Sequence, residues 1–175
     1  YILDCNNITF ERIVVSNLTS GTSGAAGGQA SHSDTYTNSG PTLKEGLTSA
    51  FYLKESGNIT INNSTISNVK AYIYGSNNTM KYNYGGTSGK SFGIYNSYSN
   101  DTVVSNTIIN QILGGKGSSA KFYADAPDGH EGTGIAILYS NNVNISGNKI
   151  HNITGGDGGN VQYAADSGDG SNGTG

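Results

Sequence analysis

Carboxylates gather in two glycine-rich stretches of the sequence, where they could wrap a metal ion. The first stretch carries Asp125, Asp128 and Glu131, and the second carries Asp157 between two pairs of glycines. Carboxylate and carbonyl oxygens are the ligands that calcium prefers. Neither stretch has EF-hand spacing, however, and an Asp-Gly turn forms without a metal. We therefore predict no cofactor, with calcium as the alternative.

The other residues that could support catalysis are dispersed. Polysaccharide-cleaving enzymes place two or three carboxylates around one bond, whereas the acids here lie singly: Asp4, Glu11, Glu55 and Asp101. Arg12 is the only arginine. The histidines, which lack metal-ligand spacing, are His32, His130 and His151. We predict no active site, and hence a protein that is not an enzyme.

Ten Asn-X-Ser/Thr triplets are potential sites of N-glycosylation. They begin at Asn7, Asn17, Asn58, Asn62, Asn63, Asn77, Asn100, Asn144, Asn152 and Asn172. A repeated Asn-Ile-Thr pattern generates such triplets automatically, and an Asn in a side-chain ladder could not be modified. Asn77, Asn100 and Asn172, which are near corners or in loops, are the better candidates. The density of triplets favours an extracellular protein.

These residues are positioned by a repeated unit, which is clearest in residues 134–156. Three short apolar runs, 135–138, 143–145 and 150–153, are separated by Ser, Asn and Gly. Alternation within a run puts apolar side chains on one strand face, and Asn and Gly suit corners because they tolerate positive φ. Three strands and three corners make one coil of a solenoid.

The spacing of the apolar anchors recurs along the chain. Ile145, Ile150 and Ile153 are five and three residues apart. The same steps separate Phe10, Val15 and Leu18; Ile61, Ile66 and Val69; and Val104, Ile109 and Ile112. Residues 71–86, where Tyr and Met replace Ile, are expected to form a weaker fifth coil. Recurrence at a fixed spacing is the signature of a solenoid.

The chain is therefore predicted to be all-β: a right-handed parallel β-helix of about five coils, with long glycine-rich loops on one side. Residues 1–175 form one domain. The loops 20–45, 116–132 and 155–175 each follow the third strand of a coil, so they should leave from one edge. These loops either form a binding surface or are tolerated at that edge because closing a longer loop costs little entropy.

Neither end of the chain carries a recognisable cap. Natural solenoids normally cover their apolar end coils, so we expect a segment of a longer protein or ends covered by a neighbouring subunit. Inward apolar residues should form stacked columns, with Asn and Ser ladders at the corners. Ile145 is expected to be one of the inward residues, and its exchange for Asp to unfold the stack.

Composition excludes several classes of function. The net charge is −3, and only 12% of residues are charged, with basic residues scattered singly. Nucleic-acid binding needs clustered Lys and Arg, so we predict no such partner. No apolar run is long enough for a membrane span. Cys5 is the only cysteine, which precludes a disulfide within the chain; we expect it half-buried beside a corner, with an intermolecular bridge as the alternative.

Tyrosine is the dominant aromatic residue, with twelve copies against four Phe and no Trp. Several cluster around the weak coil: Tyr36, Tyr72, Tyr74, Tyr82, Tyr84, Tyr95 and Tyr98. Rows of Tyr at coil spacing either stack on one another along the sheet or bind sugars or another subunit.

The pattern of residues 141–156, Asn-Asn-Val-Asn-Ile-Ser-Gly-Asn-Lys-Ile-His-Asn-Ile-Thr-Gly-Gly, resembles the parallel β-helix repeats of NosD-like proteins. With the Gly-Gly-Asp-Gly-Gly loop that follows, it is most similar to the β-helix surface proteins of archaea, methanogens in particular. The resemblance covers about three quarters of the chain and is specific for the fold. It implies an extracellular, glycosylated wall or filament component.

We therefore expect a structural protein of the cell surface that self-assembles into a layer, sheath or filament. Low charge does not oppose self-association. The alternative is a carbohydrate-binding or polysaccharide-cleaving module, such as an adhesin, lyase or hydrolase, that uses the Tyr-rich face and the one-sided loops on surface glycans.

Overall fold

The computed structural model describes residues 1–20, 47–71, 89–117, 128–160, 167 and 169–175. Within these ranges the chain is all-β, and no helix has the length and hydrophobicity needed to cross a membrane. The strands are β1 Ile2–Leu3, β2 Asn6–Glu11, β3 Val14–Thr19, β4 Leu47–Lys54, β5 Gly57–Asn62, β6 Thr65–Lys70, β7 Lys90–Ser97, β8 Asn100–Ser105, β9 Ile108–Leu113, β10 Gly132–Leu138, β11 Asn144–Ser146, β12 Lys149–Thr154 and β13 Gly173–Thr174.

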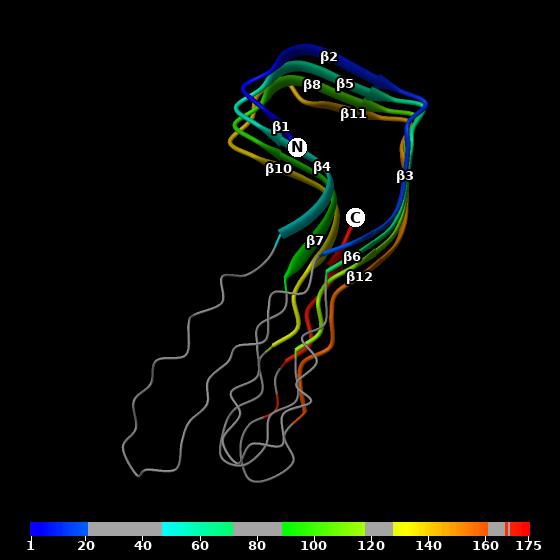
Figure 1. Ribbon diagram of the computed structural model, residues 1–175, viewed down its shortest axis with the longest axis vertical. Coiled ribbons are helices and arrows are strands. Elements are labelled where there is room, and N and C mark those ends of the chain that lie inside the picture. The colour runs from blue at the N-terminus through cyan, green and yellow to red at the C-terminus, as the bar shows by residue number, and fades with distance from the viewer. Residues whose placement is uncertain (21–46, 72–88, 118–127, 161–166, 168) are drawn as a thin grey trace, which may run out of the picture.

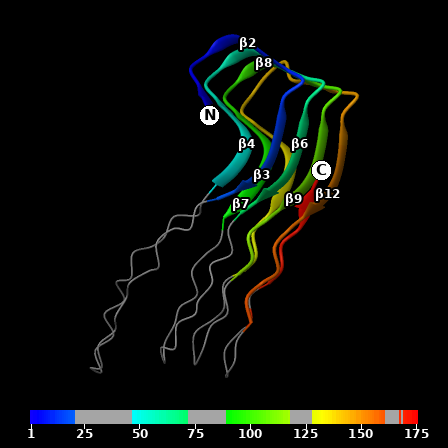
Figure 2. The ribbon, with the colours of Figure 1, turned by 45° about the vertical axis from the view of Figure 1, so that its right-hand side comes forward.

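The strands form three parallel sheets that wind into a right-handed β-helix (Figures 1 and 2). The first sheet has the order β1-β4-β7-β10-β13, the second β2-β5-β8-β11 and the third β3-β6-β9-β12. Each successive set of three strands, beginning with β1, β4, β7 or β10, makes one coil. The predicted fold is confirmed, with four complete coils and β13 added to the edge of the first sheet.

The apolar anchors occupy the columns that their spacing predicts. Phe10, Ile61, Val104 and Ile145 are in register along the second sheet. The other two anchor columns lie in the third sheet: Val15, Ile66, Ile109 and Ile150, and Leu18, Val69, Ile112 and Ile153. In the two middle coils every one of these anchors is fully buried. These columns are the main part of the hydrophobic core.

The end coils, by contrast, leave their anchors partly open to solvent. Ile145 is 46% exposed and Ile137 is 36% exposed, whereas Ile61 and Val104 are 0% exposed. The expectation that Ile145 is a deeply buried residue is therefore wrong. It lies in the correct column, but no further coil of the described chain covers the second sheet beyond β11.

Four positions in every coil have left-handed backbone conformation, with φ between 48° and 64°, and one of them lies inside the strands of the third sheet. They align into four columns: Asp4, Glu55, Tyr98 and Tyr139; Asn7, Asn58, Asp101 and Asn142; Arg12, Asn63, Asn106 and Gly147; and Asn17, Asn68, Gln111 and Asn152. Asn and Asp adopt this conformation with little strain. Tyr, Glu, Gln and Arg at equivalent positions show that packing of the coils imposes it.

Side-chain ladders join the corners of successive coils, as predicted. The amide of Asn58 donates to Asn7, and Asn142 Nδ2 donates to Asp101 Oδ1 at 3.0 Å. A second kind of ladder uses hydroxyls, since Ser56 N–H donates to Ser99 Oγ and Ser99 N–H donates to Ser140 Oγ, both at 3.0 Å. These hydrogen bonds hold neighbouring coils in one register.

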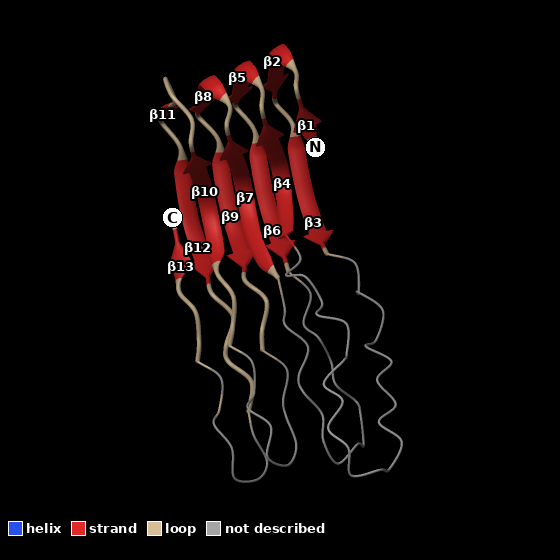
Figure 3. Ribbon diagram, turned by 90° about the vertical axis from the view of Figure 1, so that its left-hand side faces the viewer, coloured by secondary structure: helices blue, strands red, loops and turns tan. Residues whose placement is uncertain are grey.

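Every connection from the third sheet to the first begins and ends at one edge of the stack (Figure 3). The predicted one-sided arrangement is thus confirmed at the strand ends, although two boundaries need correction. Gly132 begins β10 instead of ending a loop, and residues 173–174 within the predicted loop 155–175 form β13. Most of the loop 20–45 lies outside the described residues.

The weaker coil predicted at residues 71–86 falls almost entirely outside the described residues. The strands on either side of it pair directly, β4 with β7, β5 with β8 and β6 with β9. Ile66 is therefore in register with Ile109, which leaves no space for a coil between them.

Candidate functional site

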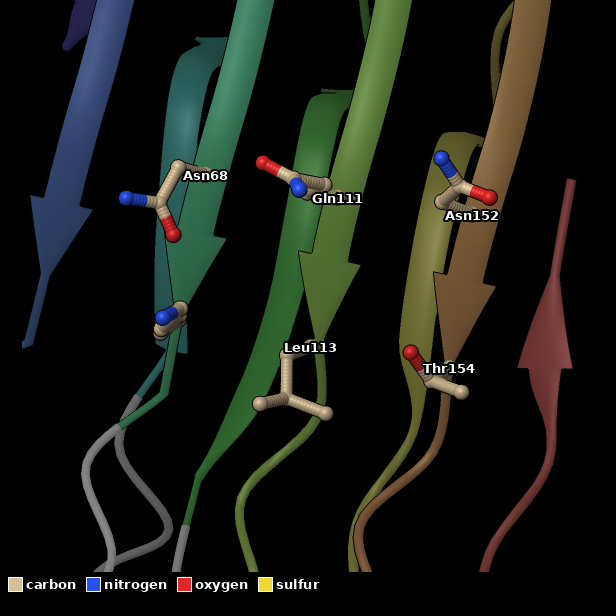
Figure 4. Close-up of a pocket in the computed structure, with 6 residues that line it drawn as sticks. Asn68, Gln111, Leu113, Asn152 and Thr154 are labelled. Atoms are coloured by element: carbon tan, nitrogen blue, oxygen red, sulfur yellow. The ribbon is translucent and has the colours of Figure 1, made fainter.

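The outer face of the third sheet carries a shallow groove of about 230 Å³ that crosses three coils (Figure 4). Its lining comes from β6, β9 and β12: Asn68, Lys70, Gln111, Leu113, Asn152 and Thr154. Each strand contributes two residues in register, so the groove repeats at the spacing of the coils. This spacing is about 4.8 Å in a β-sheet.

The amides of the groove are Asn68, Gln111 and Asn152, whose left-handed backbone conformation turns these side chains outward. Asn152 Nδ2 donates to Asn110 Oδ1 at 2.8 Å and lies 3.2 Å from His151 Nδ1. The amide of Asn68 donates to Asn17 in the first coil. The other lining residue of each strand supplies an ammonium from Lys70, an apolar side chain from Leu113 and a hydroxyl from Thr154. This lining suits hydrogen bonding to a polar chain and contains no carboxylate for acid-base chemistry.

The amide column of this groove was not predicted from the sequence, although the repeat contains a pattern that identifies it. In every coil an amide residue directly precedes the last apolar anchor: Asn17 before Leu18, Asn68 before Val69, Gln111 before Ile112 and Asn152 before Ile153. Aligning the repeats on the anchors brings these amides into one column. The strand register confirms that column.

Tyrosines form stacks along the coils. Tyr52 stacks on Tyr1 at 4.7 Å and on Tyr95 at 5.0 Å, and Tyr98 stacks on Tyr139 at 4.8 Å between ring centroids. The pKa of Tyr52 is raised, chiefly because burial disfavours the phenolate and also because Tyr95 and Tyr1 are close. The other tyrosines predicted to cluster lie outside the described residues: Tyr36, Tyr72, Tyr74, Tyr82 and Tyr84.

The three candidate calcium ligands that the structure describes each contact a different residue. Asp128 Oδ1 accepts a hydrogen bond from the Asp169 N–H at 2.7 Å. Glu131 pairs with Lys90 at 3.6 Å, and Asp157 pairs with Lys116 at 3.7 Å. The fourth candidate, Asp125, lies outside the described residues. Among the residues that are described, no group of three or more His, Cys, Asp or Glu side chains could hold a metal.

Two of the dispersed acids, Glu11 and Glu55, pair with adjacent basic side chains. Glu55 contacts Lys54 at 3.1 Å, which raises the pKa of that lysine, and Glu11 lies 3.9 Å from Arg12. All four of these side chains are substantially exposed, so their ion pairs contribute little stability.

Comparisons with protein-family models, with curated proteins and with solved structures find no match to this chain.

The potential glycosylation sites divide by the environment of the Asn side chain. Four belong to ladders or amide pairs: Asn7, Asn17, Asn58 and Asn152. Asn62 and Asn100 accept hydrogen bonds, the first from Ser105 Oγ and the second from the Asn141 N–H. All described sites except Asn62 are exposed, and three of them form no side-chain hydrogen bond within the described residues: Asn63, Asn144 and Asn172. Asn77 lies outside the described residues.

Glycines allow the chain segments beyond the third sheet to pack backbone against backbone. Gly115 N–H donates to Gly89 O, His130 N–H donates to Gly115 O, and Gly156 N–H donates to His130 O. A Cβ on Gly156 would lie 2.0 Å from Gly115 O, and one on Gly114 would lie 1.8 Å from His130 O. Only glycine fits at these positions, which explains the glycine content of this edge.

Proposed function

We propose that this chain is a structural protein of the cell surface, located outside the cell, that associates with copies of itself into a layer, sheath or filament. The supporting observation is exposed apolar surface on the third coil, where Ile108 is 42% exposed and Tyr98 is 54% exposed. Exposed apolar surface of this kind is typical of association sites.

Sedimentation velocity over a range of protein concentrations tests this proposal. The double variant Tyr98→Asp/Ile108→Asp places two charges on this apolar surface, and Asn63→Asp/Asn144→Asp is its matched control, because Asn63 and Asn144 are exposed polar residues. We expect the wild type and the control variant to associate as concentration rises and the Tyr98/Ile108 variant to remain monomeric. A wild type that stays monomeric throughout would contradict self-association.

We further propose that the protein carries N-linked glycans on Asn63, Asn144 and Asn172, whose side chains are exposed. Glycans on Asn58 or Asn152 would cost the hydrogen bonds that these amides donate to neighbouring coils. Peptide mass spectrometry of the protein secreted from a glycosylating archaeal host checks this. Modified peptides restricted to the ladder positions would contradict the assignment.

The second candidate function, glycan binding, is favoured by the groove across β6, β9 and β12. Its polar side chains recur at coil spacing and offer amide, ammonium and hydroxyl groups that form hydrogen bonds with the hydroxyls of a sugar chain. A glycan array with the wild type and with Gln111→Ala, followed by assays for reducing sugars and unsaturated products, distinguishes binding from cleavage. Turnover that depends on Asp125, Asp128 or Glu131 would favour an enzyme over a structural protein.

A further inference from the structure

We infer that the groove across β6, β9 and β12 takes an anionic polysaccharide, one whose sugar units carry carboxylates. The inference rests on glycan binding, the second function proposed above, and names the class of glycan. The groove lies on the side of the stack, on the outer face of the third sheet, so it does not depend on what adjoins the first or the fourth coil.

The third sheet differs from the rest of the chain in its charge. The chain as a whole has a net charge of −3, yet none of the strands β3, β6, β9 and β12 contains Asp or Glu. The only charged residues of these strands are Lys70 and Lys149. The third sheet therefore presents a positively charged face, and such a face attracts ligands of the opposite sign.

These two lysines also have no acidic partner. Among the basic residues that the structure describes, four pair with acids: Arg12, Lys54, Lys90 and Lys116. The side chains of Lys70 and Lys149 form no ion pair or hydrogen bond with any described residue, and both residues are exposed. Their ammonium groups are free to bind carboxylates of a ligand through charge-assisted hydrogen bonds, which are about twice as strong as neutral ones.

Gln111 supplies a free amide in the middle of the groove. It lies on β9, between Asn68 and Asn152 on the neighbouring strands (Figure 4). The amides of those two residues donate to Asn17 and Asn110, whereas the Gln111 side chain forms no hydrogen bond with any described residue. A primary amide has both donors and an acceptor, so Gln111 can form hydrogen bonds with sugar hydroxyls.

The two lysines and Gln111 lie on one diagonal of the outer face. Lys149 is in the column of Thr65, and Lys70 lies five residues beyond Thr65 on β6. Gln111 is on β9, the strand between β6 and β12. From the rise per residue and the strand spacing of a β-sheet, Lys70 and Lys149 are roughly 19 Å apart. A chain of several sugar units reaches both lysines and Gln111 at once, which a monosaccharide does not.

The other residues of the groove suit the sugar rings of such a chain. Leu113 offers an apolar surface to the C–H groups of a ring, and Asn152 and Thr154 offer an amide and a hydroxyl. A mainly apolar contact with a few polar groups that fix orientation is typical of ligand sites. None of the lining residues is acidic, so no side chain of the groove repels a carboxylate.

The experiment compares polygalacturonate with the same polymer after complete methyl esterification, which removes the charges and keeps the sugar rings. Binding of each polymer to the whole protein is measured by biolayer interferometry at low and at physiological ionic strength. We expect the charged polymer to bind about tenfold more tightly at low salt, because esterification removes the charge-assisted contacts. Added salt should reduce this difference, since both lysines are exposed.

Three variants locate the contact. Lys70→Gln should weaken binding of the charged polymer about tenfold and leave binding of the esterified polymer unchanged. Lys54→Gln is the matched control, because it removes the same charge from the first sheet, and it should change binding less than about twofold. Gln111→Gly removes the central amide and should weaken both polymers about two- to tenfold. Glycine suits this position because φ is 56° there.

The other outcomes separate this inference from the proposed glycan binding. Equal binding of the two polymers would overturn the preference for charge and leave glycan binding intact. Equal losses from Lys70→Gln and Lys54→Gln would place the contact outside the groove and overturn the inference. Equally tight binding of polyglutamate or single-stranded DNA would show that any polyanion binds, which overturns a polysaccharide ligand. Failure to bind either polymer, together with a blank glycan array, would overturn both proposals.

Discussion

Two Asp substitutions in one apolar column measure how strongly burial depends on position in the stack. Ile61 and Ile145 belong to the same column of the second sheet, but Ile61 is 0% exposed and Ile145 is 46% exposed. Ile61→Asp removes a fully buried side chain, which costs about 2–5 kcal/mol for truncation alone. It also buries an unpaired carboxylate, at an effective cost of several kcal/mol.

The sum for Ile61→Asp reaches the whole stability of a typical domain, which is about 5–15 kcal/mol. We therefore expect this variant to lose its β-structure. The carboxylate of Ile145→Asp stays hydrated, and about half of the burial energy of an isoleucine, roughly 1–1.5 kcal/mol, is lost. That variant should fold with a lower free energy of unfolding.

Urea denaturation followed by far-ultraviolet circular dichroism, at protein concentrations low enough to keep the chain monomeric, distinguishes the two cases. Equal losses of stability at the two positions would refute the reasoning, because they would show that the fourth coil is covered as completely as the second. A folded Ile61→Asp protein would contradict the column assignment itself.

Three further changes test separate features of the fold. Asn96 is fully buried with no partner for its Oδ1, and its Nδ2 donates only a long hydrogen bond of 3.4 Å to Ser99 O. Asn96→Leu should therefore raise the free energy of unfolding by about 1 kcal/mol in urea titrations, and a lower midpoint would contradict this. Gly114→Ala places a Cβ 1.8 Å from His130 O and should cost about 1–3 kcal/mol, whereas Gly170→Ala, 3.9 Å from its nearest neighbour, should change stability by less than about 0.5 kcal/mol. The pKa of Tyr52 is raised above 10.0 in the folded chain, so the neutral Tyr52 side chain stabilises the fold below that pH, and this contribution is lost as pH rises through the raised pKa. Between about pH 9 and 11 the melting temperature should therefore fall less steeply for Tyr52→Phe than for wild type.

The core of this fold could be read from the sequence because a solenoid repeats one local pattern. The steps of five and three residues between Phe10, Val15 and Leu18 recur in every coil, and parallel strands convert equal spacing into columns. The left-handed positions of Asn142 and Gly147 followed from the Asn and Gly residues between the apolar runs, whereas that of Asn152 did not, because it lies inside a strand. The Tyr98 and Tyr139 corners did not, because their left-handed conformation is imposed by stacking and not by residue type.

What the sequence did not reveal depends on neighbours in space. The partial exposure of Ile145 arises because no coil of the described chain covers β11, which the repeat pattern does not encode. The groove beside Gln111 arises from three coils together, and the contact between Gly156 and Gly115 joins segments far apart in the chain. Composition identified a glycine-rich edge, but only the fold shows that a Cβ would not fit there.

Electron cryomicroscopy of the protein, at concentrations where it associates, is the most direct test of self-assembly. The account predicts ordered layers, sheaths or filaments of β-helices whose coils are spaced about 4.8 Å apart, with contacts between copies that cover exposed apolar side chains such as Tyr98 and Ile108. Discrete particles without ordered contacts between copies would contradict it.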